Sequence, residues 1–150
     1  MNIKVNAKVN KMVSKEEMIN LLNNDLKLEY SAAIQYINHS ALMTGAQFTG
    51  IIKELKVHAT EEMQHAQTLA DQIAFLGGKP AIDVGEVKVS DDNVEMLNQD
   101  FAGELDAIER YKMRIQEAEE LQEYALAHQL RNILSMEQEH AMDLQEALGK

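Results

Sequence analysis

Four glutamates and two histidines occur at matched spacing in the two halves of this chain. In each half, one glutamate lies 33 residues before a second glutamate, which begins a Glu-x-x-His motif. Glutamate and histidine three residues apart share one face of a helix, and carboxylate and imidazole groups together suit iron or manganese. The spacing therefore predicts a site for two metal ions. Its residues are Glu29, Glu62 and His65 in the first half and Glu104, Glu137 and His140 in the second.

Each of these glutamates stands in an apolar stripe with helical spacing, as Glu29 does between Leu26 and Ala33. An unpaired carboxylate in an apolar interior costs several kcal/mol, and four converging carboxylates also repel one another. Two divalent cations would balance their charge. The alternative is that these are surface charges whose spacing is a coincidence.

Two tyrosines repeat with the same period. Tyr36 and Tyr111 each lie seven residues after the first glutamate of their half. A tyrosine there could donate a hydrogen bond to a ligand carboxylate or pass an electron. The alternative is a core tyrosine whose hydroxyl is satisfied elsewhere.

Four helices are expected to carry these residues. The first begins at the capping box Ser14-x-x-Glu17, and the third is capped by Ser90 or Asp91. Neither glycine nor proline separates the third helix from the fourth. One uninterrupted helix there would be about 87 Å long, too long for this domain, so a turn is expected near residues 119–123. The expected helices span 14–44, 47–76, 91–119 and 123–148.

The segment 77–90 contains Gly77, Gly78 and Pro80 and is expected to be a linker. Fully extended it reaches about 46 Å, enough to pass along a whole bundle. We therefore predict an all-α, ferritin-like four-helix bundle with one long crossover connection between helices 2 and 3. Residues 14–150 would form this domain, and residues 1–13 an N-terminal arm.

Composition limits the remaining classes of function. The formal net charge of −11 argues against nucleic-acid binding, and the absence of cysteine excludes disulfides and thiolate metal sites. No apolar stretch approaches the roughly 18–20 residues of a membrane span. Residues 1–13 also lack the apolar core of a signal peptide. We expect a soluble, cytoplasmic protein that binds neither nucleic acid nor membrane.

The six residues and their spacing resemble the ferritin-like di-iron carboxylate family, and within it bacterioferritin. Residues 62–66, Glu-Met-Gln-His-Ala, are similar to the second helix of bacterioferritins, and residues 29–39 to the first. The resemblance covers about residues 15–148. It implies ferroxidase activity, in which Fe(II) is oxidised by dioxygen or peroxide and then stored as mineral inside a hollow shell. By the same resemblance the terminal ligands are Glu29 and Glu104, the bridging ligands Glu62 and Glu137, and the histidine ligands His65 and His140.

A second apolar stripe predicts a twofold homodimer through the first two helices. On the second helix it contains Ile52, Ala59, Met63, Ala66 and Ala70, and on the first helix Tyr30, Ile34, Ile37 and Ala41. In bacterioferritins, a methionine at this place and its symmetry mate ligate haem b at the dimer interface. The alternative for Met63 is a methionine that fills an interface without haem.

The other histidines have simpler interpretations. His58, one turn before Glu62, could support a ligand or hold iron transiently, but a partly exposed polar residue is the preferred interpretation. We expect His39 and His128 at the surface or in an interface. Solvated faces are expected for Glu61, Glu119, Glu120 and Glu139.

Two other functions compete with iron storage. One is a small dimeric di-iron redox enzyme, such as a rubrerythrin-like peroxide reductase or an oxygenase, without mineral storage. The other is a non-enzymatic protein that binds haem or metal or acts as a scaffold. Only ten residues follow His140, whereas shell-forming members of the family usually add a short fifth helix. This departure leaves the subunit count open among a dimer, 12 and 24.

Overall fold

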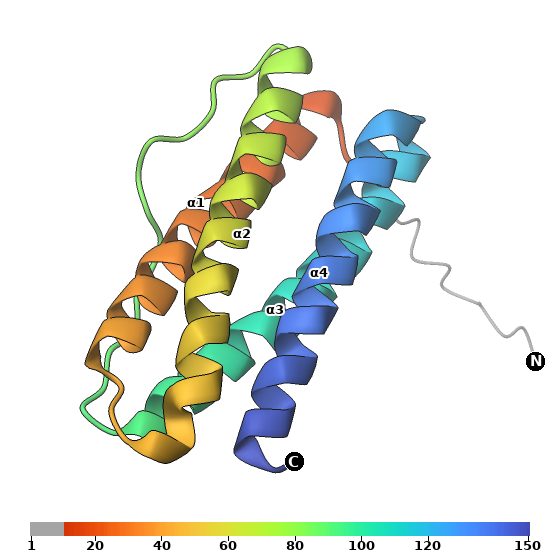
Figure 1. Ribbon diagram of the computed structural model, residues 1–150. Helices are drawn as coiled ribbons and strands as arrows, with labels where there is room; N and C mark the ends of the chain where they lie inside the picture. Colours follow the sequence, from red (N-terminus) through yellow and green to blue (C-terminus); the bar gives the residue numbers. More distant parts are fainter. Residues whose placement is uncertain (1–10) are drawn as a thin grey trace, which may run out of the picture.

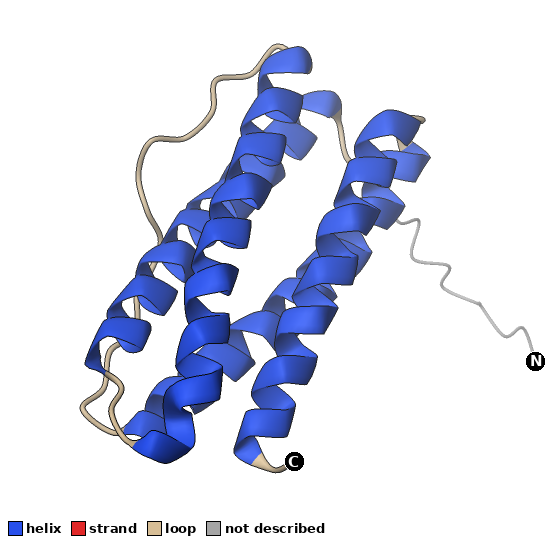
Figure 2. Cartoon of the chain, viewed as in Figure 1, coloured by secondary structure: helices blue, strands red, loops and turns tan. Residues whose placement is uncertain are grey.

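The computed structural model describes residues 11–150, and most of the predicted arm lies outside them. In this part of the chain the secondary structure is helical, without strands (Figure 2). No helix in it is both long and apolar enough to cross a lipid bilayer. The elements are α1 (Lys15–Leu42), the short 3₁₀ turn η1 (Ala46–Phe48), α2 (Thr49–Phe75), α3 (Asn93–Glu120) and α4 (Tyr124–Leu148).

The four helices form two antiparallel hairpins, α1 with α2 and α3 with α4 (Figure 1). Packing is more extensive within each hairpin than between the two. The crossover, residues 76–92, runs back along the length of α1, so α2 and α3 point in the same direction. The predicted fold class, an all-α four-helix bundle with one long crossover between its second and third helices, is confirmed.

The helix starts follow the predicted chemistry with one correction. At α1, the Ser14 hydroxyl accepts a hydrogen bond from the Glu17 amide at 3.1 Å, and the Glu17 carboxylate accepts one from the Ser14 amide at 2.6 Å. At α3, the prediction of Ser90 or Asp91 as the cap was wrong. Asp92 has the extended backbone that a cap needs, and its carboxylate accepts from the Glu95 amide at 2.7 Å.

The turn between α3 and α4 is confirmed, and it is built without glycine. Gln122 adopts a left-handed backbone with φ of 60°. The Gln122 amide donates to the Glu119 carbonyl and the Glu123 amide to the Ala118 carbonyl, both at 2.9 Å. This is the Schellman pattern, which usually places glycine at the left-handed position. A glutamine there is strained by roughly 1–2 kcal/mol, and it leaves no turn signal in the sequence.

A row of polar side chains on α1 holds the crossover in place. Asn23, Gln35 and His39 contact backbone groups of crossover residues at 2.8–3.1 Å. The Lys27 carbonyl accepts from the Gly85 amide at 3.2 Å. His39 is fully buried, and its Nδ1 lies 2.9 Å from the Asp100 carboxylate. The expectation of a surface or interface position for His39 was wrong because the crossover and α3 cover it.

The apolar core divides into two clusters, one toward each end of the bundle. One contains Leu22 and Leu26 of α1 together with Ile73 of α2. The other contains Met43, just after the end of α1, and Leu55 of α2. On every helix, the metal-ligand candidates stand in the sequence between the residues of these two clusters. The candidate site therefore interrupts an otherwise apolar core near the middle of the bundle.

One buried ionic contact ties α1 to α3. The Asp25 carboxylate, 1% exposed, accepts from Arg114 Nε at 2.7 Å and from Arg110 Nη1 at 2.8 Å. Arg114 also donates to Glu117, and Arg110 donates to Asp106. Desolvation of a buried carboxylate is tolerable only with such partners.

We expect Asp25→Ala to lower the free energy of unfolding by about 3 kcal/mol, because it leaves two poorly hydrated guanidinium groups without their shared partner. Urea unfolding at fixed protein concentration, followed by circular dichroism, measures the change. Asp106→Ala is the matched control, since Asp106 is exposed, and should change the stability by less than about 1 kcal/mol. Equal effects of the two variants would contradict the structural role given to Asp25.

Candidate metal centre

All six predicted ligand residues converge in the middle of the bundle. Their side chains come from all four helices, with Glu29 on α1 and Glu104 on α3, while α2 and α4 each supply a Glu-x-x-His pair. The four glutamates are 1–4% exposed and the two histidines 2–3%. None of the six side chains faces solvent, so the interpretation of these residues as surface charges is wrong.

The six residues form two overlapping groups. Each group contains four side chains whose ligand atoms lie within 4.8 Å of one another. The first consists of Glu29, Glu62, His65 and Glu137, and the second of Glu62, Glu104, Glu137 and His140. Glu62 and Glu137 belong to both groups. This is the arrangement that two metal ions need if two carboxylates bridge them and each ion has its own terminal carboxylate and imidazole.

Each histidine turns Nδ1 toward the carboxylates. His65 Nδ1 lies 3.3 Å from Glu62, 3.5 Å from Glu29 and 3.7 Å from Glu137. His140 Nδ1 lies 2.8 Å from Glu62, 3.3 Å from Glu137 and 3.4 Å from Glu104. Each imidazole therefore lies close to both shared carboxylates, Glu62 and Glu137, and to one further carboxylate, Glu29 or Glu104.

The two tyrosines support the terminal carboxylates across the bundle. The Tyr36 hydroxyl, on α1, donates to Glu104 on α3, and the Tyr111 hydroxyl, on α3, donates to Glu29 on α1. Burial, together with the adjacent carboxylate, raises the pKa of both tyrosines well above its usual value. Both hydroxyls therefore stay protonated and act as donors that fix the orientation of these carboxylates.

Two of the carboxyl groups have raised pKa values because they are buried close to other carboxylates. Burial, then repulsion from Glu137, Glu29 and Glu104, raises the pKa of Glu62 well above its usual value. Burial and repulsion from Glu137 raise the pKa of Glu104 to about 8. Proximity to a like charge and loss of hydration both disfavour the ionised form. Without a bound cation, the cluster therefore does not keep all four carboxylates ionised.

For the two imidazoles, the nearby carboxylates favour the charged form. Burial lowers the pKa of His65, but its contacts with Glu137, Glu29 and Glu62 outweigh burial and raise the pKa to about 12. For His140 the same balance also raises the pKa above its usual value. Contacts with both imidazoles hold the pKa of Glu137 below its usual value despite burial. Positive charge is what this cluster requires, and metal ions that displaced these protons would supply it.

Several buried atoms of the cluster have no hydrogen-bond partner. They are one carboxylate oxygen each of Glu29, Glu62 and Glu137, and Nδ1 of His140. Buried polar atoms are normally satisfied, and unsatisfied ones call for an explanation such as a bound ion. Carboxylate oxygens and imidazole nitrogens without thiolates suit iron or manganese, so the donor set fits two such ions.

Each of the two histidines also makes a contact through Nε2, on the outer side of the ring, away from the Nδ1 that faces the carboxylates. His140 Nε2 lies 2.7 Å from the Glu61 carboxylate. His65 Nε2 lies 3.4 Å from the Met136 sulfur. Glu61 was expected on a solvated face, which was wrong, since its side chain is only 27% exposed. Neither contact could be predicted from the sequence, because each joins α2 to α4.

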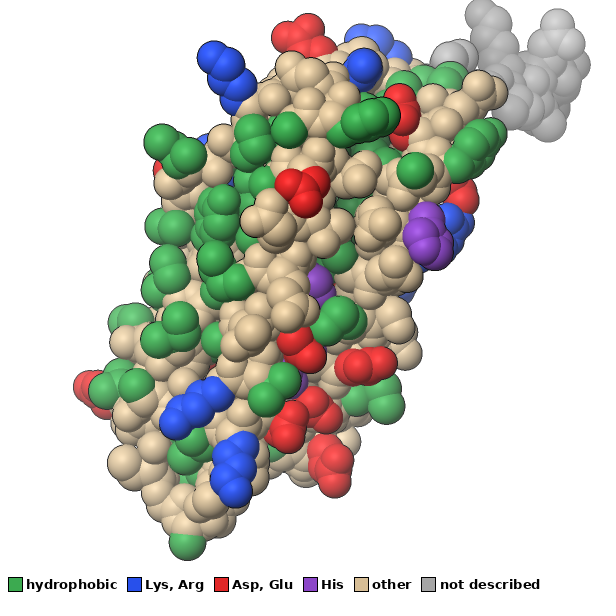
Figure 3. Space-filling view, turned by 45° about the horizontal axis from the view of Figure 1, so that its top comes forward, with side chains coloured by type: hydrophobic (Ala, Val, Ile, Leu, Met, Phe, Trp, Pro, Cys, Tyr) green, Lys and Arg blue, Asp and Glu red, His purple; other side chains and the backbone are tan. Residues whose placement is uncertain are grey.

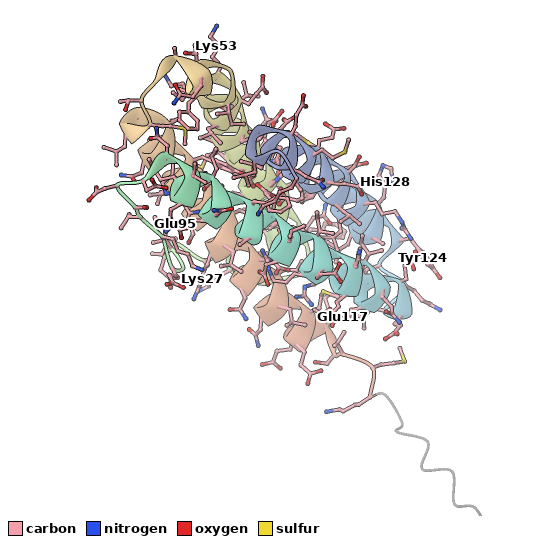
Figure 4. All side chains as sticks on the ribbon, turned by 90° about the horizontal axis from the view of Figure 1, so that it is seen from below. Lys27, Lys53, Glu95, Glu117, Tyr124 and His128 are labelled. Atoms are coloured by element: carbon pink, nitrogen blue, oxygen red, sulfur yellow. The ribbon has the colours of Figure 1, made fainter. Side chains whose placement is uncertain are left out.

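His58 is buried, so the preference for a partly exposed residue was wrong. Its ring stacks on that of His140, with the centroids 4.0 Å apart, and its Nε2 lies 3.0 Å from Asp143. Burial, then repulsion from His140, lowers the pKa of His58. His58 thus covers the His140 side of the site as a neutral ring. By contrast, His128 is exposed on α4, as expected (Figure 4).

A cavity of about 340 Å³ reaches the site from the side of α1, α3 and the crossover. Its lining includes Glu29, Tyr36 and Glu104 of the site, the buried Asp100, and the exposed Glu86 and Asp106. The cavity is large enough for a small molecule or ion, and its carboxylates favour cations.

The comparisons with known proteins agree with this geometry. The model of the ferritin family, described as a ferritin-like domain, matches residues 19–150. A bacterioferritin of Mycobacterium leprae (strain TN) is 31% identical over 125 residues, which are 83% of this chain and 79% of that protein.

Solved structures show the same fold. The ferritin-like diiron-carboxylate protein of Bacillus anthracis str. Ames has a TM-score of 0.86 and 32% identity, covering 89% of this chain and 96% of that one. The dodecameric thioferritin of Bacteroides fragilis, a bacterioferritin-related protein, has a TM-score of 0.85 and 30% identity, with coverages of 92% and 88%. Rhodobacter capsulatus bacterioferritin, solved with a metal-free dinuclear site and haem iron, has a TM-score of 0.83 and 25% identity, with coverages of 92% and 87%.

The family model spans most of the chain, and the relative described above is a bacterioferritin, the likeness that residues 29–39 and 62–66 predicted. This chain therefore belongs to the ferritin-like family.

Proposed function

We propose that the six converging residues bind two Fe(II) ions and that the protein oxidises them as the first step of iron storage. Glu29 and Glu104 would each bind one ion, Glu62 and Glu137 would bridge them, and His65 and His140 would complete one position each. The observation that carries this proposal is the pair of overlapping groups that share Glu62 and Glu137. Four carboxylates and two divalent ions have no net charge, which resolves the repulsion within the cluster.

The reaction balances as a two-electron oxidation. Each Fe(II) loses one electron to become Fe(III). Dioxygen takes up the two electrons with two protons and becomes hydrogen peroxide, or hydrogen peroxide takes them up with two protons and becomes two waters. Two ions held side by side can supply both electrons at once, which is the advantage of a paired site. The tyrosine hydroxyls of Tyr36 and Tyr111 hold the terminal carboxylates in place.

The cavity beside α1 and α3 is the proposed entrance for iron and oxidant. It connects the outside with Glu29 and Glu104, the two terminal carboxylates. Acidic side chains along it raise the local concentration of Fe(II), and the net charge of −11 acts in the same direction over a longer range. The cytoplasmic location of this reaction, expected from the sequence, stays a prediction.

We also propose a homodimer through α1 and α2, within a larger oligomer. Hydrophobic side chains gather along the side where α1, α2 and the crossover lie (Figure 3). Met63 is 49% exposed, Ile34 44% and Ile37 59%. Ala59 and Ala66, expected in this stripe, are instead buried in the bundle. An exposed apolar patch of this kind marks an interface, and the dodecamer of the related thioferritin supports a shell-like assembly.

We expect Glu104→Ala or His140→Ala to slow Fe(II) oxidation by more than about 100-fold, because even partners one layer outside the ligands change metal affinity about 10- to 100-fold. Stopped-flow absorbance after mixing with Fe(II) and air measures the rate. The matched controls are Glu109→Ala and His128→Ala, which remove exposed side chains of the same types from the same helices. Wild-type rates in the ligand variants, with helicity retained, would refute the ligand assignment.

Size distinguishes storage from the smaller redox enzyme. We expect light scattering to show a particle of many subunits that forms an iron core after addition of Fe(II) and air. A dimer without a core would favour the peroxide reductase or oxygenase alternative while leaving the di-iron site intact.

Met63 can be tested as a haem ligand at the proposed dimer interface. With haem b supplied, we expect a Soret band that Met63→Leu loses, since a methionine and its symmetry mate would hold the haem iron. Leucine keeps a similar volume, so the dimer should persist in light scattering. If the wild-type protein shows no Soret band, Met63 is an interface side chain without a haem role.

A further inference from the structure

The internal repeat of this chain allows its two halves to be compared position by position. Glu62-x-x-His65 corresponds to Glu137-x-x-His140. The residue just before each motif is therefore also a matched pair, and here the halves differ. Glu61 stands before the first motif and Met136 before the second.

These two residues contact the outer nitrogens of the ligand histidines, each in the opposite half. Glu61 on α2 places a carboxylate oxygen 2.7 Å from Nε2 of His140 on α4. Met136 on α4 places its sulfur 3.4 Å from Nε2 of His65 on α2. The contacts are equivalent in the repeat, but one acceptor is an anion and the other a thioether.

On the inner side the two histidines have equivalent surroundings. Nδ1 of each faces the two shared carboxylates and one terminal carboxylate. Each terminal carboxylate accepts a hydrogen bond from one tyrosine. A difference between the two metal positions must therefore originate outside these inner contacts, at Glu61 and Met136 or at His58, whose ring stacks on that of His140.

The outer acceptor determines how strongly each imidazole binds a metal ion. A carboxylate that accepts the Nε2 proton fixes the tautomer with a free Nδ1 lone pair and increases the donor strength of the ring. A thioether sulfur is only a weak acceptor. Glu61 therefore makes His140 the stronger ligand, and Met136 leaves His65 the weaker one.

We propose that the two metal positions are inequivalent, and that Glu61 and Met136 are the positioning residues that make them so. The position with His140 and Glu104 takes the first divalent ion. The position with His65 and Glu29 takes the second, about 10-fold or more weakly, in line with the usual effect of such outer partners on affinity. This inference rests on the proposed function only in requiring that the six residues bind two ions.

The wild-type protein itself provides the first test. The full chain, purified without metal, is crystallised with one equivalent of Co(II) per subunit, and anomalous scattering gives the occupancy of each position. We expect most of the cobalt beside His140 and little beside His65. Calorimetric titration with Co(II) should show two binding steps whose dissociation constants differ by about 10-fold or more. Neither measurement depends on oxidation activity.

Two variants test the cause. Glu61→Met gives both histidines a thioether as the outer acceptor, and Met136→Glu gives both a carboxylate. Each variant should therefore make the two Co(II) dissociation constants more nearly equal. Combining them should reverse the order of filling. Methionine and glutamate are comparable helix formers, so α2 and α4 should persist. Glu139→Met is the matched control, because it removes an exposed carboxylate from α4, and it should leave both steps unchanged.

The outcomes separate this proposal from the proposed function. Equal occupancy of both positions at one equivalent of Co(II) overturns the inequivalence while keeping the two-metal site. An unchanged order of filling in the combined variant overturns the role of Glu61 and Met136. Absence of cobalt from both positions at saturation would instead overturn the two-metal site itself.

Discussion

Four carboxylates buried in mutual contact are the constraint on which this structure depends. Burial and repulsion oppose the ionisation of Glu62 and Glu104. Two imidazoles and two tyrosine hydroxyls compensate in part, and the two proposed metal ions would complete the compensation. Each hairpin supplies half of the carboxylates, so the cluster exists only where the hairpins dock. The proposed metal binding would therefore be thermodynamically linked to the docking of the two hairpins.

The sequence predicted the fold and the convergence of the six residues because both follow from periodic patterns. A helix with a glutamate inside its apolar stripe must bury that glutamate. Equal spacing in two hairpins then brings Glu29 level with Glu62 and Glu104 level with Glu137, as the structure shows. The tyrosines were predictable as partners of carboxylates, but the crossed pairing of Tyr36 with Glu104 depends on how the hairpins dock.

Features that involve single long-range contacts could not be predicted. His39 and Asp100 are 61 residues apart, and His58 and Asp143 are 85 apart. In the sequence, each of these residues looks like part of a solvated helix face, since polar side chains at helical spacing have the same pattern whether water or a crossover covers them. The left-handed turn at Gln122 was located only through helix length, because no glycine marks it.

The crossover contacts α1 mainly through its own main chain. The Lys79 and Lys88 carbonyls and the Ala81, Gly85 and Lys88 amides make these bonds. Substitutions along this segment would therefore leave most of its anchors intact, except at Gly78 and Gly85, where a Cβ would crowd Ile19 and Ser31. An insertion or deletion between two anchors would move every following backbone group of the crossover away from its hydrogen-bond partner on α1. Among homologous chains, the length of this segment should be better preserved than its composition.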